Sequence, residues 1–450
     1  MNLPIYRERS SATPEYLAEI AHIKRLLERW EGDEEFRQLL SQDPAGTARR
    51  YGLQADAEAV RPLWDVQHAY RPEVAQAVQR YRHFIQEKID HREELRRTSR
   101  PRSDRFHAWR QRQMVRTTSQ LGFAKAHGIV HPLAAFELSK GCSVGCWFCG
   151  VSAPRLGDLF AYNDHNRGLW RDICAIWREE VGESAGQAFL YWATDPMDNP
   201  DYEKFCCDFH ELSGAFPQTT TALPLRDVGR TRRLLQLSEE RGCLLNRFSL
   251  LTLKILQRVH EEFSAEEMAF VELVLQIRKE TESKAVAGRA LERALKSGQA
   301  VETSTIACVS GFLVNMVEGS IKLISPCPAS AEHPLGYRIY AQGSFTTAEE
   351  FRSQLLKMLA SLAISVGPDD PVALRPGLDW AVSEKGLTLS SPYLLHHFPG
   401  LPEPALQRLG SLLAGGGQTA SSLALQLDAD LPTTFWLLNQ MLKVGALEEG

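Results

Sequence analysis

Three cysteines, Cys142, Cys146 and Cys149, lie close together in the segment GCSVGCWFCG. Their spacing is Cys-x3-Cys-x2-Cys, and no histidine or further cysteine stands nearby to complete the four-ligand set of a structural zinc site. Three thiolates on one tight loop can instead bind three irons of a [4Fe-4S] cluster and leave the fourth iron open to another ligand. The glycines of the segment would let the loop close tightly. A zinc knuckle or a chance grouping of thiols is the alternative interpretation.

The chain has nine cysteines, an odd number that makes complete disulfide pairing impossible. In a reducing compartment they are expected to be thiols or metal ligands. Cys174, in an apolar helical stretch, and Cys308, in an expected strand, are predicted to be buried and inert. Cys206 and Cys207 are adjacent, and no Cys-x2-Cys follows them, so a second cluster is not expected. Cys327 has a proline on each side, which fixes the backbone and directs the thiol, whether its role is functional or structural.

The elements that must position these thiols begin after Pro132, where short apolar runs alternate with helical stretches. The expected strands are 134–139, 187–193, 219–224, 246–251, 270–276 and 304–317, with helices between them, such as 172–181 and 228–241. Strands that alternate with helices indicate βα units and a parallel sheet. We therefore predict an α/β fold with a partial (β/α)6 barrel, whose reactive groups lie at the carboxyl ends of its strands. The cysteine segment follows the first of these strands.

Other segments are predicted to flank the barrel. The predicted parts are a helical domain over 1–75, a basic helical linker over 76–130, the barrel over 131–345, a connecting helix over 346–370 and a winged-helix-like module over 371–450. The linker is interpreted as a solvent-exposed helix, because basic residues outnumber acidic ones from Arg80 to Arg116. In the last module, two short strands are expected around Glu384–Gly386, followed by helices.

Composition excludes several classes of protein. Of the 450 residues, 44% are hydrophobic and 24% are charged, which excludes disorder as the main state. The formal net charge of -5 gives no overall attraction to nucleic acid or to an anionic membrane. No apolar run reaches the ~18 residues that a membrane-spanning helix needs. Met1–Ser10 is polar and lacks the apolar segment of a signal peptide, so a cytoplasmic protein is expected.

The cysteine segment, with the aromatic Phe148 before its last cysteine, closely resembles the signature of the radical S-adenosylmethionine (radical SAM) enzymes. The resemblance implies that S-adenosylmethionine chelates the open iron and is cleaved by one electron to a 5'-deoxyadenosyl radical. It also implies a glycine-rich, acidic motif after the second strand that receives the amino group of S-adenosylmethionine. Here Thr194 and Asp195 stand at that place, in a stretch that has no glycines. Arg247 and Ser249, in the fourth expected strand, resemble the polar pair that meets the carboxylate and ribose.

The whole chain resembles the radical SAM peptide epimerases that mature ribosomally made peptides of the proteusin type. The resemblance rests on FELSKGCSVGCWFCGVSA, on SPCPASAEHPLGYR and on EEFRQLLSQDPAGTARRYGL, which is also similar to the leader peptides of nitrile-hydratase-like precursors. It implies inversion of L- to D-residues in a precursor peptide with a leader and a core. A thiol would return hydrogen to the face opposite the abstraction, and Cys327 is the candidate donor. An external electron donor such as flavodoxin or ferredoxin is also implied.

Two other functions compete with this one. Another radical SAM peptide modification would form thioether or carbon–carbon cross-links, although enzymes of that kind often carry extra clusters. A non-enzymatic zinc or nucleic-acid-binding protein would use the cysteine loop structurally and residues 80–116 as a basic surface. The near-neutral net charge and the alternation of strands and helices argue against the second alternative, and neither a nucleic acid nor a membrane is expected as a partner.

Overall fold

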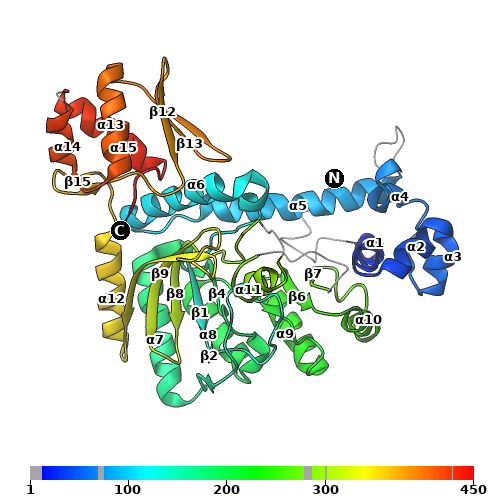
Figure 1. Ribbon diagram of the computed structural model, residues 1–450. Helices are drawn as coiled ribbons and strands as arrows, with labels where there is room; N and C mark the ends of the chain where they lie inside the picture. The colour runs from blue at the N-terminus through cyan, green and yellow to red at the C-terminus, as the bar shows by residue number, and fades with distance from the viewer. Residues whose placement is uncertain (1–12, 69–74, 278–285, 299–301, 428, 450) are drawn as a thin grey trace.

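The computed structural model describes residues 13–68, 75–277, 286–298, 302–427 and 429–449, so the polar start Met1–Ser10 lies outside the described residues. The structure is a mixed α/β fold in which parallel strands alternate with helices (Figure 1). Among the described residues, no helix is long and apolar enough to cross a membrane.

The larger sheet has five strands in the order β10-β9-β8-β1-β4. Strand β1 (Ala134–Glu137) pairs in parallel with β4 (Ala188–Phe189) on one side and with β8 (Gly311–Asn315) on the other. Strands β9 (Ser320–Pro326) and β10 (Tyr337–Ser344) extend this sheet in antiparallel order. Because β9 runs against β8, the carboxyl end of β9 lies at the edge where the parallel strands begin.

The smaller sheet consists of β5 (Thr220–Thr221), β6 (Asn246–Leu250) and β7 (Val271–Leu275), all parallel. The parallel α/β organisation is thus confirmed, but the six strands expected for the barrel fall into two separate sheets among the described residues. The ladder is interrupted because β4 and β5 are only two residues long.

The last expected strand, 304–317, is strand only in its second half, and β8 adjoins the first strand instead of the fifth. Gly311 permits this pairing, because a Cβ atom at that position would lie 2.0 Å from the carbonyl oxygen of Leu133. The last of the expected strands therefore pairs with the first, beside β1.

Helices cover one face of the larger sheet. They are α7 (Asp164–Val181), α8 (Tyr202–Ser213) and α12 (Ala348–Ser361), while α9 (Val228–Glu240) and α10 (Leu253–Glu262) accompany the smaller sheet. Phe136 of β1 packs against Trp170 and Trp177 of α7 in the main core. Side chains alternate along a strand, so Ala135 and Glu137 point to the opposite face. We call that side, together with the side of β6 that carries Arg247 and Ser249, the inner face.

The N-terminal part is helical, as predicted. Its helices are α1 (Pro14–Gly32), α2 (Glu34–Gln42), α3 (Pro44–Arg50), α4 (Arg61–Trp64), α5 (Gln76–Thr98) and α6 (Asp104–His127). Helix α6 is not the solvent-exposed linker that its basic composition suggested, because Phe106, Trp109 and Arg110 are buried against the sheet. The Arg110 guanidinium donates to the carbonyls of Ser310 at 2.6 Å and His131 at 2.8 Å, and burial lowers its pKa to about 9.

The C-terminal module lies on the other side of α6 from the sheets (Figure 1). Its elements are β11 (Pro371–Val372), β12 (Asp379–Ser383), β13 (Gly386–Ser390), β14 (Leu395–Phe398), α13 (Glu403–Gly415), β15 (Gln418–Thr419), α14 (Ala420–Gln426) and α15 (Leu431–Lys443). The strand pair around Glu384–Gly386 is confirmed, and β14 adds a third strand. Arg112 of α6 binds the carboxylate of Glu449 at 3.0 Å, which ties the module to the helix.

Candidate functional site

The cysteine loop follows the carboxyl end of β1. It leaves through β2 (Ser139–Lys140) and returns through β3 (Asp158–Leu159), which pair antiparallel. The Cys142 amide donates to the Pro154 carbonyl at 2.9 Å and closes the loop at its base. Gly141 has a φ of +83°, and a Cβ atom there would lie 2.4 Å from the Arg155 carbonyl oxygen, so glycine is required where the two arms meet. The backbone therefore gathers the three thiols on one closed loop.

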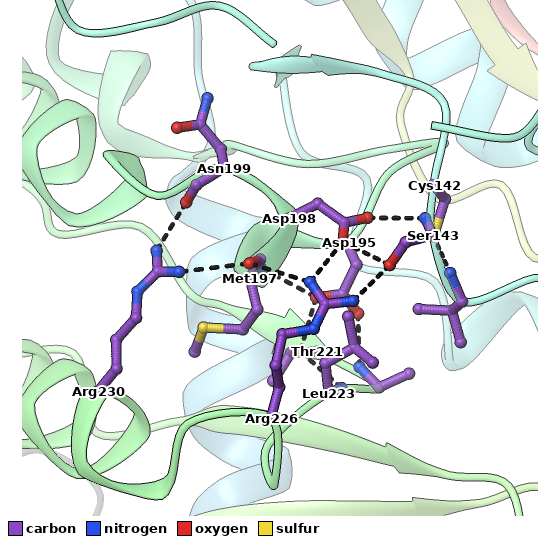
Figure 2. Close-up of polar contacts among 12 residues, drawn as sticks. Cys142, Ser143, Asp195, Met197, Asp198, Asn199, Thr221, Leu223, Arg226 and Arg230 are labelled. Atoms are coloured by element: carbon purple, nitrogen blue, oxygen red, sulfur yellow. Dashed lines mark hydrogen bonds and ion pairs between the residues drawn. The ribbon is translucent and has the colours of Figure 1, made fainter. Parts of the chain in front are cut away.

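A carboxylate from the β4 side fixes the first turn of this loop. Asp198 lies in the 3-10 turn η4 (Pro196–Asp198) and is fully buried. Figure 2 shows its carboxylate accepting from the Ser143 backbone amide at 2.8 Å and from the Ser143 hydroxyl at 2.5 Å. Arg226, which follows β5, bridges Asp198 at 2.7 Å and the Ser143 hydroxyl at 2.5 Å. Three segments that are distant in sequence thus meet beside Cys142.

The three thiols are half-buried, and none forms a disulfide. The Ala153 amide points at Cys149 Sγ from 3.3 Å and the Val144 amide at Cys142 Sγ from 3.5 Å, contacts that also stabilise a thiolate ligand. Burial raises the pKa of Cys142 to about 11 and of Cys146 to about 12, so bound iron would have to displace their protons.

Gly145, which lies between Cys142 and Cys146 in the sequence, has a φ of +65°, and a Cβ atom there would meet no atom within 4 Å. Among the described residues no three His, Cys, Asp or Glu side chains converge as ligands of one metal ion. A cluster does not require such convergence, because each cysteine binds a different iron. The loop therefore fits a cluster ligated by three cysteines. Phe148 is buried within the loop, and its ring packs edge-on against that of Trp147, with the ring centroids 5.4 Å apart.

Asp195, expected to receive the amino group of S-adenosylmethionine, makes three hydrogen bonds within the chain. Its carboxylate accepts from the Thr221 hydroxyl at 2.7 Å, the Ala222 amide at 2.7 Å and the Met197 amide at 2.9 Å. It thereby joins the ends of β4 and β5, and burial raises its pKa to about 6. These bonds hold Asp195 between the two strand ends. The neighbouring Thr194 hydroxyl is buried without a hydrogen-bond partner among the described residues, so it can receive a ligand.

Arg247 and Ser249 lie together on the inner face of β6, both half-buried. The guanidinium of Arg247 donates to Glu272 of β7 at 2.6 Å and to Gln218 at 3.4 Å, and Glu272 also pairs with Lys88 of α5. The structure therefore brings Arg247 and Ser249 to one face, and the Glu272 carboxylate binds the Arg247 guanidinium.

Glu137, which the sequence reasoning did not single out, ends β1 just before the cysteine loop. Its carboxylate accepts from the Ala193 amide at 2.8 Å and from the Asn315 side chain at 3.1 Å, so it links the ends of β1, β4 and β8. Burial raises its pKa to about 7. An acidic residue within an apolar strand, directly ahead of the cysteines, was the signal that could have identified it.

This raised pKa predicts how stability depends on pH. Ionisation of Glu137 opposes folding as the pH rises from its ordinary pKa of 4.5 through about 7, so its contribution to stability is complete below that window and lost above it. We expect Glu137→Gln, which cannot ionise, to gain melting temperature over the parent at pH 8 but not at pH 4.5. Exposed Glu292 supplies the control, Glu292→Gln. Equal melting-temperature differences from the parent at both pH values would contradict the assignment.

The structure separates Cys327 from the cysteine loop. Cys327 follows β9, at the edge of the sheet where the parallel strands begin, whereas the loop leaves β1 at the opposite edge. The thiol is buried, which raises its pKa to about 11, while the charges of Arg116 and Arg338 act in the opposite direction.

Cys308 lies on the inner face, contrary to the expectation of a buried thiol in a strand. It is half-buried, and it precedes β8 at the edge of the sheet where Cys327 also lies. With Phe189, Trp192 and Tyr337 it packs against the inner-face cluster around Ala135 and Leu313. Burial raises its pKa to about 12, and the charge of Arg247 acts in the opposite direction. Of the described thiols outside the cysteine loop, Cys308 is the one that joins this inner-face cluster. Cys174 and Cys206 are buried in the helical core, as expected for Cys174.

Comparison with known proteins gives one strong match. No family model matches the chain. A solved structure, the crystal structure of BtrN in complex with AdoMet and 2-DOIA, aligns with a TM-score of 0.30 at 14% identity, over 42% of this chain and 72% of BtrN. A TM-score of this size carries no argument about function. The uncharacterized protein y4wI of Sinorhizobium fredii (strain NBRC 101917 / NGR234) is 39% identical over 459 residues, which are 97% of this chain and 89% of the relative. At this identity over almost the whole length, the chain belongs to the same family as y4wI.

Proposed function

We propose that the chain is a radical SAM enzyme that inverts L-residues to D-residues in a ribosomally made peptide. One observation carries the first part of the proposal: three free thiols lie on a closed loop at the carboxyl end of the first parallel strand. In α/β folds that edge is where reactive groups gather. The epimerase part rests on the resemblance of the sequence segments quoted above, and the match to y4wI assigns no activity because that protein is uncharacterized.

Cys142, Cys146 and Cys149 would hold the cluster, and the Thr194 hydroxyl is available to a bound ligand at the end of β4. When bound, the cluster and S-adenosylmethionine would supply a 5'-deoxyadenosyl radical that takes a hydrogen atom from the substrate. The residues of the chain then have two tasks, to hold the peptide with its α-carbon on the inner face and to return hydrogen from the opposite side.

Hydrogen return requires a thiol that stays protonated near the substrate. Cys327 was the candidate from sequence, and its raised pKa of about 11 meets the first requirement. Cys308 also stays protonated, with a pKa of about 12. Its position on the inner face, beside Phe189, Trp192 and Tyr337, favours it as the thiol that lies near the substrate. The thiyl radical left on the donor would regain a hydrogen through an electron from an external donor, such as flavodoxin or ferredoxin, and a proton.

The leader of the precursor peptide needs a docking site apart from the reactive centre. The N-terminal helices and the C-terminal module are both candidates, and the proposal does not depend on which of them binds it. A cross-linking enzyme of the same superfamily would use the same cysteine loop, so the products must distinguish the two reactions.

The test is the reaction in deuterium oxide with a candidate precursor peptide that has a leader and a core. Inversion by an exchangeable thiol is expected to add one deuterium to each converted residue, because hydrogen returns from a solvent-exchanged S–H. Chiral analysis of the hydrolysed peptide identifies the residues, and the same reaction in ordinary water, where inversion leaves the mass unchanged, is the control. Loss of two hydrogens from the peptide, with no D-residue, would replace inversion by cross-linking.

A further inference from the structure

A second set of contacts holds the cysteine loop, at residues other than the Ser143 that Asp198 binds. It comes from the start of helix α11 (Gly288–Lys296), which follows the smaller sheet. The Arg289 backbone amide donates to the Cys149 carbonyl at 3.0 Å, and its guanidinium donates to the Cys146 carbonyl at 2.7 Å and to the Ala153 carbonyl at 2.6 Å. One residue therefore ties together the turn between two of the cysteines and the exit of the loop.

The preceding residue allows this close approach. Gly288 has a φ of +50°, and a Cβ atom there would lie 2.4 Å from the Gly150 carbonyl oxygen and 2.8 Å from that of Cys149. Both atoms belong to backbone and cannot move aside as a flexible side chain would. Only glycine lets the helix begin in contact with the loop.

The helix also brings positive charge to the loop. Arg289 donates to carbonyls only, and within the described residues no carboxylate pairs with it. Arg293, one helical turn further along, lies over the Trp147 ring at 5.6 Å. The partial positive charge of a helix N-terminus adds to that of the guanidinium. The two formal charges and the helix end therefore face the segment that carries Cys146 and Cys149.

We propose that Arg289 is a positioning residue that fixes the ligand loop and raises the reduction potential of the cluster bound there. This inference rests on the proposed function, since it assumes a cluster on the three cysteines. Reduction adds one electron, and a nearby positive charge without a compensating carboxylate stabilises the more negative state. Hydrogen bonds and charges around the thiolates are among the factors that set cluster potentials. The guanidinium thus has a mechanical effect through its bonds and an electrostatic effect through its charge.

Two substitutions separate these effects. Arg289→Met removes both, and Arg289→Lys keeps the charge while losing the forked pair of hydrogen bonds. Lys296→Met, at the exposed end of the same helix, removes the same charge away from the loop and is the matched control. Gly288→Ala pushes the helix away from the loop and leaves every charge in place.

Amide hydrogen exchange over residues 142–154 of the metal-free protein reports the mechanical effect. In Arg289→Met, the loss of two hydrogen bonds from a charged donor is expected to speed amide exchange about tenfold or more. Gly288→Ala is also expected to speed exchange, because the helix no longer contacts the loop. Lys296→Met is expected to exchange at the parent rate. An electron-paramagnetic-resonance titration of the reconstituted protein reports the potential, which is expected to become more negative in Arg289→Met and to stay near the parent value in Arg289→Lys.

Parent-like exchange together with a parent-like potential in Arg289→Met would overturn the inference. The exchange measurement needs no cluster, so it still decides the mechanical claim if the parent protein binds no iron. In that case the proposed function fails by itself, and a tenfold change in exchange would retain Arg289 only as a residue that positions the loop.

Discussion

Replacing Cys146 by alanine is expected to leave a folded protein that holds no stable cluster and cleaves S-adenosylmethionine at background level. Cys146 lies at the middle of the loop, and its half-buried thiol makes none of the side-chain contacts that tie the loop to β4. Two remaining thiolates cannot hold three irons of the cluster. Iron and sulfide content after anaerobic reconstitution, the visible absorption of the cluster and 5'-deoxyadenosine formation check the result.

Half-buried Cys207 on helix α8 provides the control, because it is a thiol far in sequence from the loop and belongs to no predicted ligand set. Cys207→Ala is expected to keep parent levels of iron and of cleavage. A Cys146→Ala protein with parent-like iron and cleavage would show that the loop does not ligate the cluster.

The second large effect concerns the returning hydrogen. Cys308→Ala is expected to slow inversion at least about a hundredfold while S-adenosylmethionine cleavage continues, because the inner-face thiol is removed and the cysteine loop is untouched. Cys327→Ala removes a thiol that does not belong to the inner-face apolar cluster joined by Cys308, and it is expected to keep inversion. Inverted residues are counted by chiral analysis, and 5'-deoxyadenosine is measured in the same samples.

The reverse pattern would restore the candidate that the sequence favoured. If Cys327→Ala loses inversion and Cys308→Ala keeps it, then Cys327 is the thiol that returns hydrogen. Cys308→Ser serves as a further comparison, because serine nearly conserves the shape of the thiol but has an O–H bond that does not readily give up hydrogen. Its inversion rate is expected to fall with that of the alanine variant.

Much of the fold follows from local patterns. Apolar runs predicted β1, β6 and β7 within a residue or two, and α2 ends before Asp43 and Pro44, where the sequence indicated a stop. The position of β8 could not be predicted in this way, because it depends on the contact of Gly311 with a distant carbonyl. The basic composition of helix α6 wrongly suggested exposure to solvent. Its arginines instead bind protein groups, as Arg110 binds the Ser310 carbonyl and Arg112 the side chain of Glu449.

The candidate site shows the same division. The cysteine spacing identified the ligands, since these lie within one short segment. The residues that hold the loop come from elsewhere in the chain: Asp198 from the β4 side, Arg226 after β5 and Arg289 from α11. These three residues belong to no recognisable sequence motif. Asp195 stands at the place of a motif, and in the structure its carboxylate joins two strand ends. Side chains that act by long-range contact become visible only in the folded chain.

The most direct measurement of the central claim uses the parent protein of the Cys146→Ala experiment. The protein, purified without oxygen, is assayed for iron, sulfide and 5'-deoxyadenosine after addition of S-adenosylmethionine and a reductant. We expect a brown protein that contains iron and sulfide and forms 5'-deoxyadenosine only when reduced. A colourless protein that binds zinc through Cys142, Cys146 and Cys149, and does not cleave S-adenosylmethionine, would contradict the assignment of these cysteines to a radical SAM cluster.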